Sequence, residues 1–110
     1  MNALRNKVQL IGHVGQDPEI KNLDGGKKVA NLTIATNDSY KNDKGEKVEQ
    51  TEWHRVVAWG KTAEIIEKYV TKGKEIALEG KLTHRSYDDK NGEKRYITEV
   101  LIHELLLMSK

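Results

Sequence analysis

The stretch Thr51-Glu-Trp-His-Arg-Val-Val-Ala-Trp-Gly-Lys61 carries the strongest strand signal in this chain and contains both of its tryptophans. Valine and aromatic residues favour a pleated strand, and Gly60 ends the run. Because side chains alternate between the two faces of a strand, one face carries Trp53, Arg55, Val57 and Trp59. The opposite face is small and apolar, as a core-facing surface should be, and carries His54, Val56 and Ala58.

Two large rings with a guanidinium between them suit one of two purposes. An exposed ring offers its π-face to a nucleobase, which contributes about 1–3 kcal/mol per stacked base, and Arg55 would supply charge for a phosphate. Alternatively, both rings pack into the core and Arg55 is a solvated charge at the edge, since aromatic residues are common in strands for packing reasons. This strand alone leaves both interpretations open, and the rest of the chain has to decide between them.

Length and composition predict a single domain over residues 1–110 with one modest core. Charged residues make up 33% of the chain and apolar ones 36%, and 19 Lys and Arg against 17 Asp and Glu leave a net charge of +2. A nucleic-acid partner would therefore require the positive charge to be concentrated on one face. The chain has no cysteine, which excludes disulfides and thiolate metal sites and is compatible with a reducing compartment.

The sequence also lacks the signals of a membrane protein or an enzyme. It has no signal-peptide core at its start and no apolar run of membrane-spanning length, so we expect a soluble cytoplasmic domain. The histidines, at positions 13, 54, 84 and 103, have no metal-ligand spacing, and Gly25-Gly26 lacks the Lys-Ser/Thr of a phosphate-binding loop. No Ser or Asp lies in a recognisable nucleophile context, so we expect no metal, no cofactor and no catalysis.

Apolar patterning and turn signals predict five strands and one helix. The strands are expected over 6–15, with a kink at Gly12, and over 28–39, 51–61, 74–82 and 96–107. The helix is expected over 61–71, with Thr62 as its cap and Gly73 at its end. Its core face would carry Ala63, Ile66, Tyr69 and Val70. Alternation assigns to the core face of the second strand Ala30, Leu32, Ile34 and Thr36, and to one side of the fourth Ile76, Leu78 and Leu82.

Residues 39–53 and 86–100 share a pattern of Ser-Tyr, four residues, Gly-Glu-Lys, three residues and Thr-Glu. We favour chance and common turn chemistry over shared ancestry, because glycine at a loop tip arises readily. In either case the pattern predicts two similar hairpin fingers, each with a tyrosine at its base and lysines along it. Asn91-Gly92 is the strongest short hairpin signal in the chain.

Three strands, a helix and two further strands predict an all-β fold, mainly β with one helix. The order matches the OB-fold, a five-stranded Greek-key barrel that binds oligonucleotides on its open face and loops, here with the helix between strands 3 and 4. Of the six aromatic rings, Tyr69 and Tyr96 are expected in the core. The other four are assigned to surfaces, and basic residues interleave with them, which favours nucleic-acid binding. These rings are Tyr40, Trp53, Trp59 and Tyr87.

The chain resembles the bacterial-type single-stranded DNA-binding proteins over nearly its whole length. The motifs that carry the resemblance are N-K-V-Q-L-I-G-H-V-G-Q-D-P-E at 6–19, N-L-T-I-A-T-N at 31–37, T-E-W-H-R-V-V-A-W-G-K at 51–61, Y-V-T-K-G at 69–73, E-G-K-L at 79–82 and R-Y-I-T-E-V at 95–100. The first and third of these motifs are highly specific. The resemblance implies an OB-fold homotetramer that single-stranded DNA wraps around.

In that family four aromatic positions stack on bases, and they fall on Tyr40, Trp53, Trp59 and Tyr87. The positions associated with the DNA backbone fall on Arg55, Lys61, Lys72, Arg85 and Arg95. The subunit-contact region falls on Lys7, Val8, Gln9, Leu10, Ile11 and His54. The implied function is sequence-independent coating of single-stranded DNA during replication, repair and recombination, in the cytoplasm and associated with the nucleoid.

One departure from the family pattern concerns the end of the chain. Typical members continue into a flexible Gly/Pro/Gln-rich linker and an acidic tip that recruits other enzymes, whereas this sequence stops at Met108-Ser109-Lys110. Tail-mediated recruitment of replication and repair proteins is therefore not supported. An accessory or replication-restart interaction module without a tail stays open as an alternative, and so does RNA binding, because stacking alone does not distinguish RNA from DNA.

Overall fold

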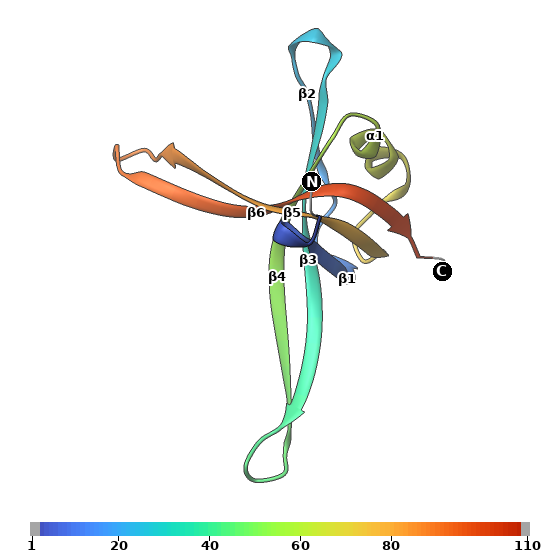
Figure 1. The fold of residues 1–110 in the computed structure, drawn as a ribbon, viewed down its shortest axis with the longest axis vertical. Coiled ribbons are helices and arrows are strands. Elements are labelled where there is room, and N and C mark those ends of the chain that lie inside the picture. The colour runs from blue at the N-terminus through green and yellow to red at the C-terminus, as the bar shows by residue number, and fades with distance from the viewer. Residues whose placement is uncertain (1–2, 109–110) are drawn as a thin grey trace.

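The computed structural model describes residues 3–108, which form six strands, one α-helix and two short 3₁₀ helices (Figure 1). In chain order the elements are η1 (Ala3–Asn6), β1 (Val8–Val14), β2 (Glu19–Asn22), η2 (Asp24–Gly26), β3 (Lys28–Lys41), β4 (Lys47–Trp59), α1 (Gly60–Tyr69), β5 (Glu75–Asp88) and β6 (Lys94–Leu107).

Five of these strands close into a barrel. They are hydrogen-bonded in the order β1-β5-β6-β4-β3, and β1 also pairs with β3 through His13 opposite Ala35 and Val14 opposite Ile34. The predicted kink at Gly12 allows this closure, because a Cβ atom there would clash with the carbonyl oxygen of Ala35. The helix lies between β4 and β5 in the chain, so the predicted five-stranded barrel with one helix is confirmed.

Strand β2 is the element that the sequence patterning missed. It pairs antiparallel with the start of β3, from Glu19 opposite Asn31 to Asn22 opposite Lys28. Only Ile20 in this four-residue strand is apolar, so the periodicity is too weak to read. Its backbone pairing with β3, and not its own side chains, defines it as a strand. Between β2 and β3 the chain turns at Gly25 and Gly26, which have φ of 82° and 81°.

The core is built from aliphatic residues of the barrel and one face of α1. Ile34, Ile66 and Ile76 are fully buried, and the core face predicted for the second strand is confirmed for Ala30, Leu32 and Ile34. Ala63 and Val70 bury beside Ile66 as expected. These three form a narrow stripe at 100° per residue.

Two of the aromatic residues expected in the core are outside it. Tyr69 lies beyond the edge of the helical stripe and is 59% exposed, and Tyr96 lies on a projecting hairpin and is 77% exposed. The capping prediction was also wrong. The helix begins at Gly60, so Thr62 falls inside the first turn, and no side chain caps the start.

The end of α1 differs from the expected one as well. The helix stops at Tyr69, and Val70 N–H donates to the carbonyl of Ile66. Gly73 has the left-handed conformation expected, with φ of 90°, but it lies beyond the helix in the loop to β5. Its N–H donates to the carbonyl of Val14 at 2.8 Å, which ties this loop to the end of β1.

Strands β3 to β6 are longer than predicted because their pairing continues beyond the core. The β3–β4 and β5–β6 hairpins project from the barrel in different directions (Figure 1). The register shift between Glu79 and Gly80 leaves His103 of β6 unpaired, so the alternation along β5 itself continues unchanged. Leu82 therefore has the same parity as the buried Ile76 and Leu78, but it lies beyond Gly80, the last residue of β5 that pairs with β1, and it is exposed.

Replacing Ile66 by alanine should lower the free energy of unfolding by about 2–5 kcal/mol, because the side chain is fully buried between α1 and the barrel. The matched control is Ile65→Ala, one residue earlier on the exposed side of the helix, which should cost much less. Urea unfolding at one fixed protein concentration measures both. Equal losses would contradict docking of α1 through the stripe that contains Ile66.

Candidate nucleic-acid interface

The two projecting hairpins end in loops of the same geometry. We call residues 37–51 the first finger and 84–98 the second. In the first finger the Asn42 side-chain oxygen accepts from the N–H groups of Lys44 and Glu46, both at 2.9 Å. In the second, an Asp89 carboxylate oxygen accepts from Asn91 and Glu93, also at 2.9 Å. The shared sequence pattern therefore corresponds to a shared loop structure.

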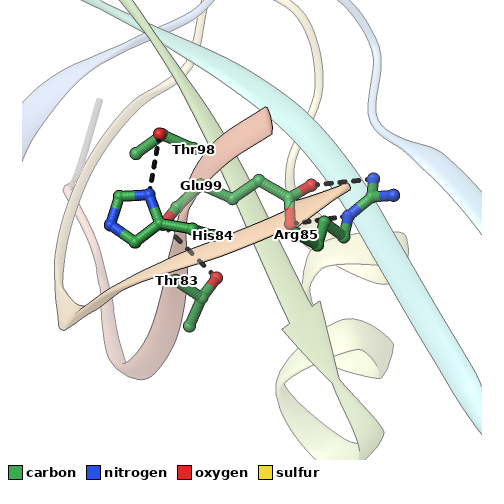
Figure 2. A network of polar contacts seen from close by, with 5 residues as sticks. All are labelled: Thr83, His84, Arg85, Thr98 and Glu99. Carbon is green, nitrogen blue, oxygen red and sulfur yellow. Dashed lines mark hydrogen bonds and ion pairs between the residues drawn. The ribbon is translucent and has the colours of Figure 1, made fainter. Parts of the chain in front are cut away.

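The likeness extends to the base of each finger. The Thr51 hydroxyl donates to the side-chain oxygen of Asn37 at 2.7 Å. The pair at the same position of the second finger is His84 Nδ1 and the Thr98 hydroxyl, 2.9 Å apart (Figure 2). In both fingers these cross-strand pairs link two directly opposed residues. Side-chain hydrogen bonds of this kind hold the hairpins together where they leave the core.

The two tryptophans lie outside the core on β4. Trp53 is 62% exposed and Trp59 is 48% exposed, and Arg55 between them is exposed too. The ring of Trp53 lies directly against Gly15, where a Cβ atom would clash with it. Within this chain the alternative that the tryptophans are core residues is therefore wrong, and the aliphatic side of β4 supplies the core instead.

The two predicted stacking tyrosines are both exposed, and they occupy corresponding positions of the two fingers. Tyr40 is opposite Val48, five positions along the hairpin from the pair of Ala35 and Trp53. Because side chains alternate between faces, Tyr40 lies on the face of the first finger opposite to that of Trp53. Tyr87 is opposite Arg95 and shares its face with Arg85. Tyr96, which the sequence assigned to the core, is opposite Ser86 and so lies on the other face of the second finger.

A cleft lies between the β2–β3 hairpin and strands β4 to β6. Its two adjoining hollows share Lys21, Asn31, Arg85 and Glu99 in their linings. Arg55 lines one hollow and Trp59 lines the other. The structure thus brings together two of the predicted basic residues and one of the predicted rings in a single concave surface.

Two residues of this cleft were missed by sequence reasoning. Lys21 was missed because it lies on β2, and the only signal for that strand was one apolar residue in a polar segment. Glu99 was missed because an acidic residue argues against nucleic-acid binding when it is read alone. In the structure its carboxylate accepts from Arg85 Nε at 3.1 Å and Nη2 at 3.2 Å, and this pairing raises the pKa of Arg85 (Figure 2).

The other predicted backbone-contact residues lie outside the cleft. Lys61 is exposed in the first turn of α1. Lys72 is exposed in the loop after α1, where its backbone N–H donates to Asp17 at 2.8 Å. Arg95 is at the tip of the second finger, and its Nε donates to Asp89 at 2.8 Å. The positive residues therefore border the cleft and the second finger and do not form one compact patch.

Four of the predicted subunit-contact residues, Val8 to Ile11, lie on β1, on the side of the barrel where β1, β5 and β6 are neighbours, and Lys7 directly precedes them. Ile11 and Leu106 are exposed there beside a shallow hollow that Leu10 also lines. Gln9 donates to Glu79 at 3.3 Å and Lys7 pairs with it at 3.4 Å. The hydrogen bond from Gln9 is the largest cause of the lowered pKa of Glu79. His54, by contrast, finds its partner within the chain, with Nε2 2.9 Å from the Thr36 hydroxyl.

Neither a metal site nor a membrane-spanning helix is found in the part of the chain that the structure describes. No group of three or more His, Asp or Glu side chains among residues 3–108 is arranged to hold an ion. The helix α1 is too short to cross a membrane.

Comparisons with known proteins agree with this geometry. The chain matches the Single-strand binding protein family over residues 5–108. It is 46% identical over 104 residues to Single-stranded DNA-binding protein 1 of Chlorobaculum tepidum, which covers 94% of this chain and 64% of the relative. A Plasmodium falciparum SSB structure solved in complex with ssDNA is similar with a TM-score of 0.87 and 34% identity, covering 94% of this chain and 95% of that one.

A second solved structure gives the same result. It is a deletion mutant of the single-stranded DNA binding protein from Thermus aquaticus, with a TM-score of 0.81 and 30% identity, covering 94% of this chain and 50% of that one. Fold and surface together define an OB-fold with exposed aromatic and basic side chains beside a cleft. The chain belongs to the single-strand binding protein family, which confirms the resemblance carried by the sequence motifs. It spans about two thirds of the length of the curated relative it matches, 64%.

Acid should affect the tip of the second finger and spare that of the first. The hydrogen bond from Arg95 lowers the pKa of Asp89 from its usual 3.8. Because the pKa of Asp89 is lower in the folded than in the unfolded protein, the ionised carboxylate stabilises the loop fully at pH values above its unfolded-state pKa. This stabilisation is lost as the pH falls through the pKa of Asp89 in the folded protein. In an NMR titration the amide protons of Asn91 and Glu93 should therefore shift at a pH below 3.8.

The first finger provides the internal control for this titration. The amide protons of Lys44 and Glu46 bind the Asn42 side-chain oxygen, which does not titrate. Equal shifts in both fingers, or an Asp89 titration at or above pH 3.8, would contradict the assignment of the carboxylate as the loop's acceptor.

Proposed function

We propose that this protein binds single-stranded DNA without sequence preference and coats it during replication, repair and recombination. The observation that carries the proposal is the exposed strip of Trp53, Arg55 and Trp59 on β4 beside the cleft that Arg55 and Arg85 line. Two similar proteins support the proposal, since one is named a single-stranded DNA-binding protein and the other was solved in complex with ssDNA.

The chemistry of this surface suits a strand whose bases are unpaired. Bases exposed by strand separation stack on Trp53 and Trp59, and every base has a π-face, so stacking tolerates any sequence. Arg55 and Arg85 meet the phosphates that run past the rings. On the second finger Tyr87 extends the surface from Arg85, and on the first finger Tyr40 offers a further ring on the face opposite Trp53. Duplex DNA keeps its bases inside the helix and offers these rings nothing to stack on.

Binding of this kind involves no covalent step. Lys61, Lys72 and Arg95 would contact the strand where it leaves the cleft, by charge and without base recognition. Affinity should fall as salt rises, because each phosphate contact releases a condensed counterion. The cytoplasmic, nucleoid-associated location expected for this activity stays a prediction.

We further propose that the chain assembles as a homotetramer through the β1 side of the barrel. This surface exposes Ile11 and Leu106 beside a shallow apolar hollow. Next to it, Gln9 and Lys7 both bind the carboxylate of Glu79. A second copy of the chain would cover these side chains and remove their apolar area from water. The His54 ring has a hydrogen-bond partner within the chain, the Thr36 hydroxyl, so it would contribute to the subunit contact by packing and not by a hydrogen bond.

Trp53→Ala and Trp59→Ala should each lower the affinity for oligo(dT) by about 1–3 kcal/mol, since each removes one stacking ring. Titration of intrinsic fluorescence at several salt concentrations measures this. Each variant keeps one tryptophan, so its residual quenching reports on the remaining ring alone. A duplex of equal length and oligo(U) are titrated in parallel.

The control variant is Ile66→Ala, a core truncation away from the cleft that should reduce stability by about 2–5 kcal/mol while leaving affinity nearly unchanged at a temperature where it is folded. Absence of quenching in the folded wild-type protein would contradict the proposed function and favour a protein partner for the aromatic surface. Equal binding of oligo(U) would make the partner single-stranded nucleic acid in general.

Ile11→Glu should break the assembly, because it places a charge where a second copy would bury an apolar side chain. Sedimentation velocity would measure the change, with the wild type expected at four times the mass of the chain and the variant at a smaller species. Ile65→Glu on α1, which also replaces an exposed isoleucine, is the control and should leave the assembly intact. An Ile11→Glu protein of unchanged mass would exclude this surface as the interface.

A further inference from the structure

Glu99 is an unusual residue for a nucleic-acid-binding surface. It lies on β6, which pairs with both β5 and β4, and it is the one buried charged residue among residues 5–108, at 8% exposed. Burying a carboxylate is unfavourable unless it is paired and hydrogen-bonded. Its partner is Arg85 on the neighbouring strand, so the two residues depend on each other.

The pair has a side-on geometry that leaves much of the guanidinium available. Nε and Nη2 of Arg85 donate to the two different carboxylate oxygens of Glu99 (Figure 2). A guanidinium has five N–H donors in a rigid plane, so three of them point elsewhere, including both on Nη1. The Arg85 side chain is 55% exposed while that of Glu99 is 10% exposed. The carboxylate is therefore the fixed partner, and the arginine presents its other edge to solvent.

The position of this pair in the cleft gives it a use. Arg85 and Glu99 line both hollows, at the junction between the one that contains Arg55 and the one that contains Trp59. A strand stacked on Trp59 that passes Arg55 has to cross this junction. An arginine held in one orientation loses less conformational entropy when it binds a phosphate than a freely rotating one does.

We propose that Glu99 is a positioning residue, which holds the Arg85 guanidinium so that its free N–H groups bind a phosphate of the strand between Trp59 and Arg55. This inference rests on the proposed single-strand binding. Glu99 itself does not touch the DNA. Its negative charge would repel a phosphate if it were exposed, but the bidentate pairing neutralises it.

The first finger lacks this arrangement, which indicates that the pair is not a by-product of the shared hairpin structure. Arg85 and Glu99 correspond to Asp38 and Glu52, at the same spacing of 47 residues as the matched loop positions Asn42 and Asp89. Asp38 is acidic, and Glu52 is exposed and accepts from Gln50. Only the second finger therefore carries an arginine supported by a buried carboxylate.

The test compares Glu99→Gln and Arg85→Lys with the wild type, in oligo(dT) titrations over a range of salt. Gln keeps the size of the side chain but loses the charge that holds the guanidinium. Lys keeps the positive charge but has no planar fork with which to hold Glu99 and a phosphate together. We expect each variant to lower the affinity about three- to tenfold. We also expect the slope of log affinity against log salt concentration, the salt slope, to become less steep by about 0.7, the value for one phosphate contact on a single strand.

A double variant and a charge control distinguish positioning from a plain change in the charge of the cleft. If Glu99 acts through Arg85, Glu99→Gln should have little further effect in the Arg85→Lys protein, so the two losses should not add. Glu19→Gln removes the same charge from the lining of the same cleft without releasing an arginine. It should leave the salt slope unchanged and should not weaken binding. Thermal unfolding of every variant confirms that the titrations are made on folded protein.

The outcomes are distinct for the positioning role and for the binding function on which it rests. Wild-type protein that does not bind oligo(dT) contradicts the proposed function. Wild-type binding with a Glu99→Gln affinity equal to or tighter than wild type, at an unchanged salt slope, overturns the positioning role and leaves Glu99 as a simple repulsive charge. Additive losses in the double variant also overturn it. Should Glu99→Gln not fold, Arg85→Lys decides alone, and an unchanged affinity and slope would reject the bidentate role.

Discussion

The alternation of side chains along β4 is the constraint on which the rest of the structure depends. This strand pairs antiparallel with β3 along its length and parallel with β6 at Val56 and Val57, so it lies inside the sheet there. Val56 and Ala58 point into the barrel and are buried, which obliges Trp53 and Trp59 to point out. A shift of one residue would bury the rings and expose the core. Fold and binding surface are therefore set by a single register.

An aliphatic core makes this arrangement possible. None of the six aromatic rings is needed to fill the barrel, because Ile34, Ile66 and Ile76 with smaller residues around them pack it fully. Rings that are not needed for packing can be placed on strands and fingers. Exposed aromatic side chains that gather on one surface generally mark an interaction surface. Tyr69 and Tyr96 are likewise not needed for packing, and they are exposed without lining the cleft.

The two fingers carry the same structural solution with different chemistry. Their loops are closed by the side chain of one residue, Asn42 or Asp89, that accepts from two backbone N–H groups. The first finger uses a neutral amide and the second a carboxylate, which also binds Arg95. Directly after the second finger, the buried carboxylate of Glu99 pairs with Arg85 of that finger. Charge pairs thus order the arginines of the second finger, whereas the first finger has no comparable pairing among the described residues.

The sequence by itself determined the features that depend on neighbouring residues. Alternation identified the core face of β3 and the two faces of β4, glycine marked the kink at Gly12, and the repeated loop pattern predicted both fingers. The order of elements was then sufficient for the barrel. What only the tertiary structure decided depends on pairing between distant segments. Strand β2 exists through its pairing with β3, Leu82 is exposed because the pairing of β5 with β1 ends at Gly80, and Arg85 becomes ordered because Glu99 lies beside it on another strand. No local pattern encodes those contacts, since each partner is chosen by register and burial.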